Sequence, residues 1–313
     1  MSLTVVGSIA FDAVTTPFGS RERMLGGSAV HFSLASSFFT DVRPVGPVGD
    51  DFGDDEYGVL AQRGVLTDGI EHVPGGETFF WRGHYEYDLN VAHTDDTRLN
   101  VFGAFQPKLS EEARACDTLF LANIQPDLQR EVREQCTEAR FVALDSMNLW
   151  IETARDSLLK TIEGVDCVML NDAEIRMLTR KPNLVQAARE LRALGPKVVV
   201  AKQGEYGSAL LTDEGFFGLP AFPLETVLDP TGAGDSFAGG FVGYLAAHGA
   251  GRDAIAHETL CQAMAYGTAI ASYNVEQFGT ERVRRLTREE IVERVGELRR
   301  MTHFTDAPIA LRA

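Results

Sequence analysis

Short apolar runs alternate with segments of helical periodicity through the middle of the chain. The apolar runs are rich in β-branched and aliphatic residues and lie at 141–144, 167–170 and 198–201. Their length suits buried strands. Helical segments lie between them and begin near Ile151, at Asp172 and at Leu184. This alternation predicts βαβ units and an α/β fold, a doubly wound, mainly parallel sheet with helices on both faces.

The region from about 70 to 105 has a different pattern. It is rich in Thr, Phe, Trp, Tyr, His and Asn and lacks a helical period, which predicts antiparallel strands. We expect residues 13–25 to add another strand. A small β-sheet at the edge of the main domain would then cover the site as a lid. Its aromatic side chains suit either a core of its own or a homodimer contact.

Length and charge limit the classes of function. With 313 residues and 44% hydrophobic content, the chain can bury one large core, so we expect a single domain over residues 1–313. The formal net charge is −16, and no basic patch offsets it. This balance argues against nucleic acid or an anionic membrane as a partner.

The first residues and the cysteines predict a cytoplasmic protein. The chain starts directly with the strand-like segment 3–6 and has no basic leader, and no apolar run approaches the roughly 18 residues that a bilayer requires. The cysteines are far apart and form no C-x-x-C pair; they are Cys116, Cys136, Cys167 and Cys261. We therefore expect reduced, buried thiols and neither a zinc site nor a disulfide framework.

A glycine-rich turn stands before an apolar helix that we expect from Ser236 to about Ala247. The turn reads Asp229-Pro230-Thr231-Gly232-Ala233-Gly234-Asp235. Small residues let backbone N–H groups converge on an anion, and the helix adds the positive end of its dipole. This arrangement predicts a phosphate site. Asp235 is either an N-terminal capping residue or a base that deprotonates a hydroxyl attacking a bound phosphoryl group.

Polar residues follow several predicted strands at their carboxyl ends, where ligands of parallel sheets gather. They are Asp12, Asp145, Asn171 and Lys202. Structural alternatives exist: Asp12 suits a turn, Asp145 a helix cap and Lys202 a plain β-turn. The pair Gly26-Gly27 opens a helix and, taken alone, is an ordinary junction between a loop and a helix.

Asn171 and Glu174 form an N-x-x-E pattern at the start of a predicted helix. On the first turn they share one face and can hold a hydrated cation. The same spacing makes a capping box, with Asn171 as N-cap and Glu174 at N3. The local sequence is compatible with both.

The glycine-rich turn resembles the D-T-x-G-A-G-D signature of the ribokinase-like (PfkB-type) family of carbohydrate and nucleoside kinases. Pro230 stands at the second position, and the rest of the turn matches. The segment 46–53 resembles the other, amino-terminal glycine-rich signature of that family. There is one departure. Ribokinases place an Asn in the helix after the glycine pair, where this chain has His31, and this argues against ribose as the acceptor.

The resemblance implies roles on the acceptor and phosphate sides. Asp235 would be the catalytic base, and the amides of residues 232–234 (Gly232, Ala233 and Gly234) would form the anion hole. The positions that would bind hydroxyl groups of the acceptor are Asp12, Gly26, Gly27 and His31. Asp145, in a D-x-x-N loop, would face the transferring phosphate.

The resemblance also implies ATP and Mg²⁺ as cofactors. The residues on this side would be Asn171, Glu174, Lys202, Gly204 and Thr231, of which Asn171 and Glu174 would organise water around Mg²⁺. Related kinases bind adenine along the helix that we expect to begin near Ala263. They hold a monovalent cation, K⁺, through loop carbonyls that include those of Asp229 and Thr231. Their lids are built from the same two segments as the lid expected here.

The leading hypothesis is an ATP-dependent kinase that phosphorylates a hydroxymethyl group of a sugar or sugar-like molecule. A nucleoside is the alternative acceptor, and a non-catalytic sugar or nucleotide sensor is the alternative of another class. A dinucleotide oxidoreductase is disfavoured because no G-x-G-x-x-G follows the first strand. A P-loop NTPase is disfavoured because G-x-x-x-x-G-K-[ST] does not occur.

Overall fold

The computed structural model describes residues 2–249, 251 and 255–303, and within them the larger sheet has nine strands in the order β13-β12-β11-β10-β9-β8-β1-β4-β5. Its strands are β1 Ser2–Val6, β4 Asp41–Val48, β5 Ile70–His72, β8 Thr118–Leu121, β9 Phe141–Asp145, β10 Cys167–Asn171, β11 Val198–Lys202, β12 Ser208–Thr212 and β13 Gly215–Leu219. All pairs from β5 to β11 are parallel, and β12 and β13 add an antiparallel edge. The predicted α/β fold with a mainly parallel sheet is confirmed.

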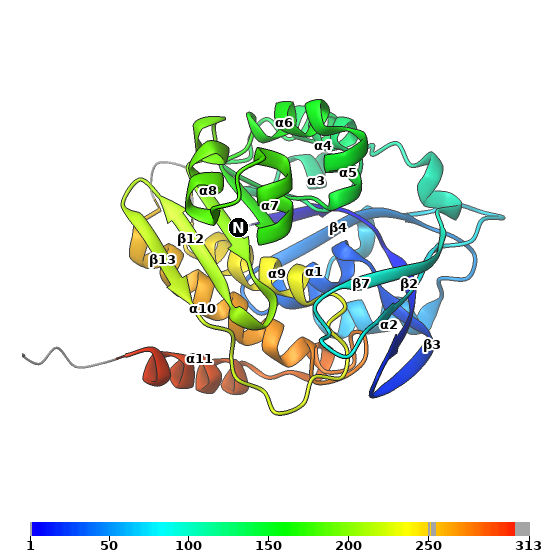
Figure 1. Cartoon of the computed structure of the whole chain (residues 1–313). Coiled ribbons are helices and arrows are strands. Elements are labelled where there is room, and N and C mark those ends of the chain that lie inside the picture. Colours follow the sequence, from blue (N-terminus) through cyan, green and yellow to red (C-terminus); the bar gives the residue numbers. More distant parts are fainter. Residues whose placement is uncertain (1, 250, 252–254, 304–313) are drawn as a thin grey trace, which may run out of the picture.

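Helices cover both faces of this sheet (Figure 1). They are α1 Ser28–Ser36, α2 Asp54–Gln62, α3 Glu111–Arg114, α4 Pro126–Gln135, α5 Asn148–Thr153, α6 Arg155–Ile162, α7 Asp172–Thr179, α8 Leu184–Ala193, α9 Ala233–Ala247, α10 His257–Asn274 and α11 Arg288–Thr302. One buried apolar cluster joins the sheet to α1, α9 and α10, and the other joins it to α4, α6, α7 and α8. This two-sided core is the reason that the strands are apolar along nearly their whole length.

Glycines hold α9 unusually close to its neighbours. A Cβ atom on Gly239 would lie 2.4 Å from the carbonyl oxygen of Phe32 in α1, and one on Gly243 would lie 2.9 Å from the Cα of Ser36. On the adjacent side, a Cβ on Gly240 would lie 2.9 Å from the Cα of Gly267 in α10. Only glycine permits such approaches. Helix α9 therefore packs directly against the backbones of α1 and α10.

A separate small sheet has the strand order β3-β2-β6-β7. Its strands are β2 Ala10–Thr16, β3 Gly19–Gly26, β6 Phe79–Tyr85 and β7 Ala92–Arg98. The small sheet confirms that segments from both predicted regions pair, but three details of the prediction were wrong. Residues 13–25 form parts of two strands, β2 pairs with β6 in parallel, and β5 belongs to the large sheet.

Three further boundaries differ from the prediction. Helix α9 begins at Ala233 and not at Ser236, because Gly232 adopts a left-handed conformation, with φ of +73°, and serves as its N-cap. Helix α10 begins at His257, before the apolar pattern near Ala263. Asp12 lies within β2 and not at the end of the first strand, since the chain leaves β1 at Val6 and resumes an extended course at Ala10.

The four cysteines are free; Cys116, Cys136 and Cys167 are buried as predicted, whereas Cys261 is only partly buried. No helix in the described part of the chain combines the length and apolar character needed to cross a membrane.

Candidate active site

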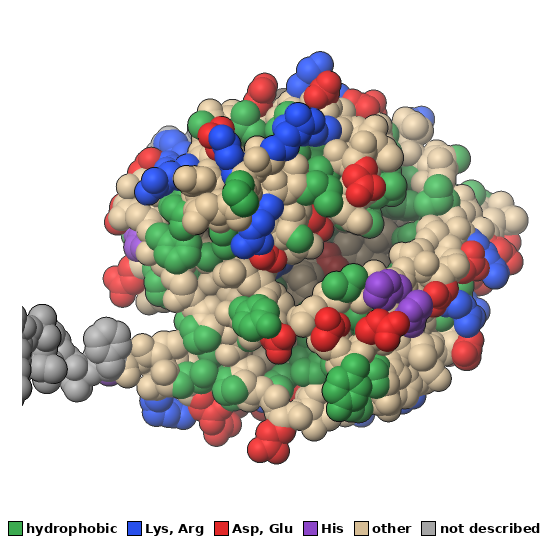
Figure 2. Space-filling model, in the orientation of Figure 1, with side chains coloured by type: hydrophobic (Ala, Val, Ile, Leu, Met, Phe, Trp, Pro, Cys, Tyr) green, Lys and Arg blue, Asp and Glu red, His purple; other side chains and the backbone are tan. Residues whose placement is uncertain are grey.

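The carboxyl ends of the central strands meet the start of α9. Asn171 at the end of β10 pairs in register with Lys202 at the end of β11, and Asp145 ends the neighbouring β9. Figure 2 shows a hollow in this face of the molecule, between the helices α5 and α7 on one side and the small sheet on the other. Ligands of parallel α/β sheets bind at this edge.

Lys202 connects the sheet to the glycine-rich turn. Its Nζ atom lies 2.5 Å from Oδ2 of Asp145, and the side chains are 18% and 6% exposed. The same Nζ atom would lie 3.3 Å from a Cβ atom on Gly234. The alternative in which Asp145 caps a helix is wrong, because α5 has Met147 as its N-cap. Asp145 instead forms an ion pair with Lys202, and this pair places the ammonium group of Lys202 beside the turn.

The turn itself is held by its own carboxylate. Oδ1 of Asp229 accepts a hydrogen bond of 2.9 Å from the backbone N–H of Thr231, and Oδ2 accepts one of 2.9 Å from Gly279. The amide of Ala233 donates a long hydrogen bond, 3.2 Å, to the carbonyl of Pro230. One of the three amides predicted for the anion hole is thus engaged within the turn.

Asp235 is the third residue of α9, and it is half-buried. Burial and, to a smaller extent, the nearby charge of Asp145 raise its pKa to about 7, although the charge of Lys202 opposes this rise. A carboxyl group with such a pKa accepts a proton efficiently near neutral pH. The N-cap position belongs to Gly232, so Asp235 is not the N-cap residue of α9.

Asp12 lies against the glycine pair before α1. A Cβ atom on Gly26 would lie 1.9 Å from Oδ2 of Asp12, so only glycine fits there. Burial raises the pKa of Asp12 to about 7, the charge of Asp229 adds to this, and the backbone of Gly27 opposes it. The structure brings these three residues together. Their contact with an acceptor stays a prediction.

His31 is 2% exposed and lies beneath the glycine-rich turn. Its Nδ1 atom is 3.2 Å from Oδ1 of Asn274, and a Cβ atom on Gly232 would lie 2.4 Å from several of its ring atoms. Burial lowers its pKa to about 4. The sequence predicted that His31 contacts the acceptor, whereas the contacts seen here are with the turn and with α10.

Asn171 and Glu174 form the capping box. Oδ1 of Asn171 accepts a hydrogen bond of 2.7 Å from the N–H of Glu174, and Oε2 of Glu174 accepts one of 2.8 Å from Asn171. Burial raises the pKa of Glu174 to about 7, and Lys202 opposes this. Among the described residues, no cluster of three or more His, Cys, Asp or Glu side chains is arranged to hold a metal ion. The Mg²⁺ role of this pair stays a prediction.

The end of β6 and the connection that follows it contact the glycine-rich turn and the turn after β11, which the sequence did not indicate. The hydroxyl of Thr231 donates to the hydroxyl of Tyr85 at 3.2 Å. Asn90 donates a hydrogen bond of 3.1 Å to Glu205, beside Gly204, whose φ is +57°. No local spacing pattern could have revealed these contacts, because they join residues more than 100 positions apart.

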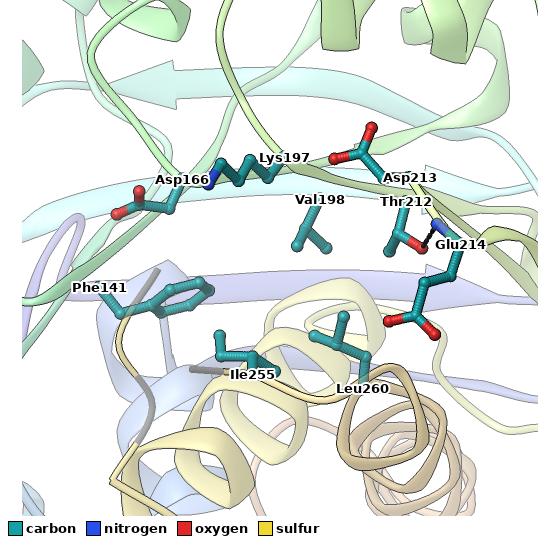
Figure 3. Close-up of a pocket in the computed structure, with 9 residues that line it drawn as sticks. All are labelled: Phe141, Asp166, Lys197, Val198, Thr212, Asp213, Glu214, Ile255 and Leu260. Carbon is teal, nitrogen blue, oxygen red and sulfur yellow. Dashed lines mark hydrogen bonds between the residues drawn. The ribbon is translucent and has the colours of Figure 1, made fainter. Parts of the chain in front are cut away.

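A cavity of about 100 Å³ lies at the opposite edge of the sheet (Figure 3). Phe141 and Val198 begin β9 and β11, and Asp166 directly precedes β10. The cavity is thus at the amino ends of the parallel strands, away from Asp235 and Lys202. This location does not suit the chemistry of the glycine-rich turn.

Comparisons with known proteins agree with the geometry. Residues 3–285 match the family described as pfkB family carbohydrate kinase. The chain belongs to the PfkB family of carbohydrate kinases. A cytidine kinase of Thermococcus kodakarensis is 30% identical over 80% of this chain and 90% of its own length. An ATP-dependent ribose-1-phosphate kinase of Halopiger xanaduensis is 26% identical over 79% of this chain and 82% of its own length.

Solved structures share the fold of this PfkB family member. A nucleoside kinase of Burkholderia thailandensis in complex with inosine has a TM-score of 0.78 at 18% identity, covering 94% of this chain and 96% of that chain. A ribokinase II of E. coli in complex with ATP and Mg²⁺ has a TM-score of 0.76 at 18% identity, covering 95% and 99%. Kinase activity toward an alcohol group of a carbohydrate or nucleoside follows from the family.

Proposed function

We propose that this PfkB family kinase transfers the γ-phosphoryl group of ATP to a hydroxymethyl group, with Asp235 as the base. The observation that carries the proposal is the placement of Asp235 in the first turn of α9, beside the glycine-rich turn and Lys202, where burial raises its pKa. Asp235 takes the proton of the attacking hydroxyl as its oxygen bonds to phosphorus, and the bond to the β-phosphate oxygen breaks to release ADP.

The turn and Lys202 would stabilise the transferring phosphoryl group. The residues that would surround its charge are Gly232, Ala233, Gly234 and Lys202. Helix α9 directs the positive end of its dipole to the same place. Because Asp145 already neutralises Lys202, the ammonium group is positioned before the nucleotide arrives. Such preorganised charge lowers the barrier of phosphoryl transfer.

Glu174 and Asn171 would hold Mg²⁺ through water. The capping box uses Oε2 of Glu174, and the carboxyl group lies close enough to Lys202 and Asp145 for their charges to affect its pKa. Oxygen ligands of this kind fit Mg²⁺. When bound, Mg²⁺ would neutralise charge on the nucleotide phosphates.

A nucleoside is the acceptor that the small sheet favours over a free sugar. Trp81 on β6 lies in register beside Asp12 on β2, so the two side chains share a face of that sheet. Tyr85, four residues further along β6, lies on the same face and reaches Thr231. The Trp81 ring packs over Gly83, where a Cβ atom would lie 2.3 Å from it. Such a surface suits stacking of a base. The names of the cytidine kinase and nucleoside kinase relatives support the same class.

The acceptor and the activity are tested together by ADP release across a panel of nucleosides, pentoses and hexoses. We expect turnover with one or more nucleosides, with sugars weaker. Turnover with hexoses alone would remove the nucleoside proposal. Tight nucleotide binding without ADP release from any acceptor would instead favour a sensor on this scaffold.

We also propose for this kinase three features that the sequence predicted. A monovalent cation such as K⁺ would bind the loop carbonyls near Asp229 and Thr231, which the contacts of Asp229 tie to Gly279. The exposed strands β3 and β7 would let the small sheet form a homodimer. Use of ATP supports a cytoplasmic location. Activity in K⁺ against Na⁺ and sedimentation analysis test the cation and the dimer.

A further inference from the structure

We propose that His31, Ser236 and Asn274 form a buried positioning network that keeps the glycine-rich turn in its anion-binding shape. The inference rests on the proposed function, because it assumes that Gly232 to Gly234 receive the phosphoryl group. The three residues come from α1, α9 and α10, and their exposed fractions are 2%, 0% and 0%. The network therefore joins three helices directly below the turn.

Asn274 is the centre of this network, and its amide group can have only one orientation. Its Nδ2 atom lies 2.8 Å from the carbonyl oxygen of Thr231. A carbonyl oxygen only accepts, so Nδ2 is correctly placed as the donor. Oδ1 of Asn274 must then accept from both remaining partners, the hydroxyl of Ser236 at 3.1 Å and Nδ1 of His31 at 3.2 Å.

This orientation also fixes the proton on His31. Since Oδ1 of Asn274 cannot donate, Nδ1 of His31 carries the hydrogen. The other ring nitrogen, Nε2, is buried and has no hydrogen-bond partner among the described residues. A second proton there would be a buried charge without compensation, and burial indeed lowers the pKa of His31 to about 4. His31 is thus a neutral donor to Asn274 across the neutral pH range.

The neutral ring supports the turn from below. A Cβ atom on Gly232 would lie 2.4 Å from Cγ, Nδ1 and Cε1 of His31, so the backbone of Gly232 rests against the face of the imidazole. Asn274 holds the preceding carbonyl, that of Thr231. Contact and hydrogen bond together fix two successive residues of the turn. His31 acts through Gly232 and Asn274, which makes it a positioning residue.

Single substitutions separate the two contributions of His31. His31→Phe keeps a ring below Gly232 and removes the donor to Asn274, whereas His31→Gln keeps a donor and loses the ring. We expect His31→Phe to lower kcat about tenfold, because a shifted turn stabilises the transferring phosphoryl group less well in the transition state. The KM values for ATP and acceptor should change less than about threefold. Asn274→Asp removes the donor to Thr231 and is expected to lower kcat about 100-fold.

Ser33→Ala provides the matched control. Ser33 lies in the same helix, and its buried hydroxyl has no hydrogen-bond partner among the described residues. Its kcat is expected to match the wild type. Thermal unfolding and circular dichroism of each variant identify any loss of folding, and the variants that fold decide the result.

A double-mutant cycle tests the contact between His31 and Gly232. Gly232→Ala places a methyl group against the imidazole, and His31→Ala in the same chain removes the ring that it meets. We expect the kcat of Gly232→Ala/His31→Ala to be at least about fivefold higher than that of Gly232→Ala alone. Independent sites would not show such coupling.

The possible outcomes are distinct. Wild-type kcat in His31→Phe and Asn274→Asp, or purely additive effects in the cycle, would overturn the network. Equal changes in kcat and in all KM values, with lowered unfolding temperature, would also overturn it, because they indicate only general destabilisation. Full turnover of Asp235→Asn would point to failure of the proposed base, and the cycle would still report on the network.

Discussion

Helices α1 and α9 begin in similar ways but surround their carboxyl groups differently. Each helix follows a glycine-rich junction, Gly26-Gly27 or the turn ending at Gly232. At each junction the pKa of a carboxyl group is raised to about 7, mainly by burial: Asp12 beside α1 and Asp235 in the first turn of α9. In both places the positive end of a helix dipole faces a carboxyl group that is only partly ionised at neutral pH.

The difference lies in the neighbours of the two carboxyl groups. Asp12 comes from β2, is 6% exposed, and is packed so closely that Gly26 has no room for a Cβ atom. Asp235 lies on α9 itself, is half-buried, and is subject to the charges of Lys202 and Asp145. A tightly enclosed carboxyl group suits orientation of a bound molecule, and a more accessible one suits proton transfer. The junction alone does not decide between these roles.

The largest expected effect separates the two carboxyl groups by kinetics. Asp235→Asn should lower kcat by about 10³-fold, with binding of ATP and acceptor nearly unchanged, because only the proton acceptor is lost. Asp12→Asn should instead raise the KM for the acceptor about tenfold or more, with a smaller change in kcat. Steady-state ADP release and calorimetric nucleotide binding measure both. If Asp235→Asn and Asp12→Asn changed kcat and the acceptor KM in the same way, the two carboxyl groups would not have the different roles assigned here.

Alanine substitutions at the two junctions should differ in the same sense. Gly26→Ala forces a methyl group to within 1.9 Å of Oδ2 of Asp12, whereas the nearest atom that Gly234→Ala meets is Nζ of Lys202, at 3.3 Å. We expect Gly26→Ala to raise the acceptor KM about 30-fold and Gly234→Ala to lower kcat about tenfold. Initial-rate measurements over a range of acceptor concentration resolve the two parameters. A larger rise in acceptor KM for Gly234→Ala would contradict this assignment.

The pH dependence should depend on Lys202. With the pKa of Asp235 at about 7, kcat/KM of the wild type should fall as the pH decreases below that value, because the protonated carboxyl group accepts no proton. Lys202 opposes this rise in pKa, so Lys202→Met should shift the acidic limb to higher pH and lower kcat about tenfold. Lys181→Met, at an exposed ion pair with Glu190, is the matched control. An unshifted limb would show that Lys202 does not act on the base.

Removing the charge of Glu174 should change the metal requirement by a smaller factor. Glu174→Gln retains an oxygen that can accept from the N–H of Asn171, so the capping box persists. The Mg²⁺ concentration for half-maximal rate should rise about fivefold with little change in acceptor KM. Glu56→Gln, whose side chain accepts from the N–H of Gly53 at the start of α2, serves as the control. An unchanged Mg²⁺ requirement would leave Glu174 with a structural role alone.

The smallest expected effect is a rise in the stability of the folded protein when Asp235→Asn removes the carboxylate charge. The pKa of Asp235 is higher in the folded chain than the ordinary value of 3.8, so the folded state binds the proton more tightly. The protonated Asp235 side chain therefore contributes to the stability of the folded state below about pH 3.8, and this contribution is lost as the pH rises through about 7. Asp235→Asn should therefore unfold at a temperature a few degrees higher than the wild type at pH 8. The difference should shrink by pH 5. Scanning calorimetry at both pH values checks this, and a lower unfolding temperature at pH 8 would contradict it.

The predictable part of the site was local in sequence. Gly232 to Asp235 form a turn and the start of a helix, and Asn171 with Glu174 forms a capping box, because the partners are within a few residues of each other. The sequence left open whether Asn171 and Glu174 only cap the helix or also bind Mg²⁺. The capping box exists, and this observation alone does not settle the role of the pair in binding Mg²⁺.

The sequence by itself determined the alternation of strands and helices, the carboxyl edge at which polar residues gather, and the family. The periodicity of apolar residues and the spacing of glycines are local features of the sequence, so rules for neighbouring residues are enough to interpret them. Only the tertiary structure decided that Asp145 pairs with Lys202 and that His31 supports Gly232 and bonds Asn274. These partners are separated by 57 to 243 positions, and packing of the helices and strands, through glycines that permit close contact, brings them together.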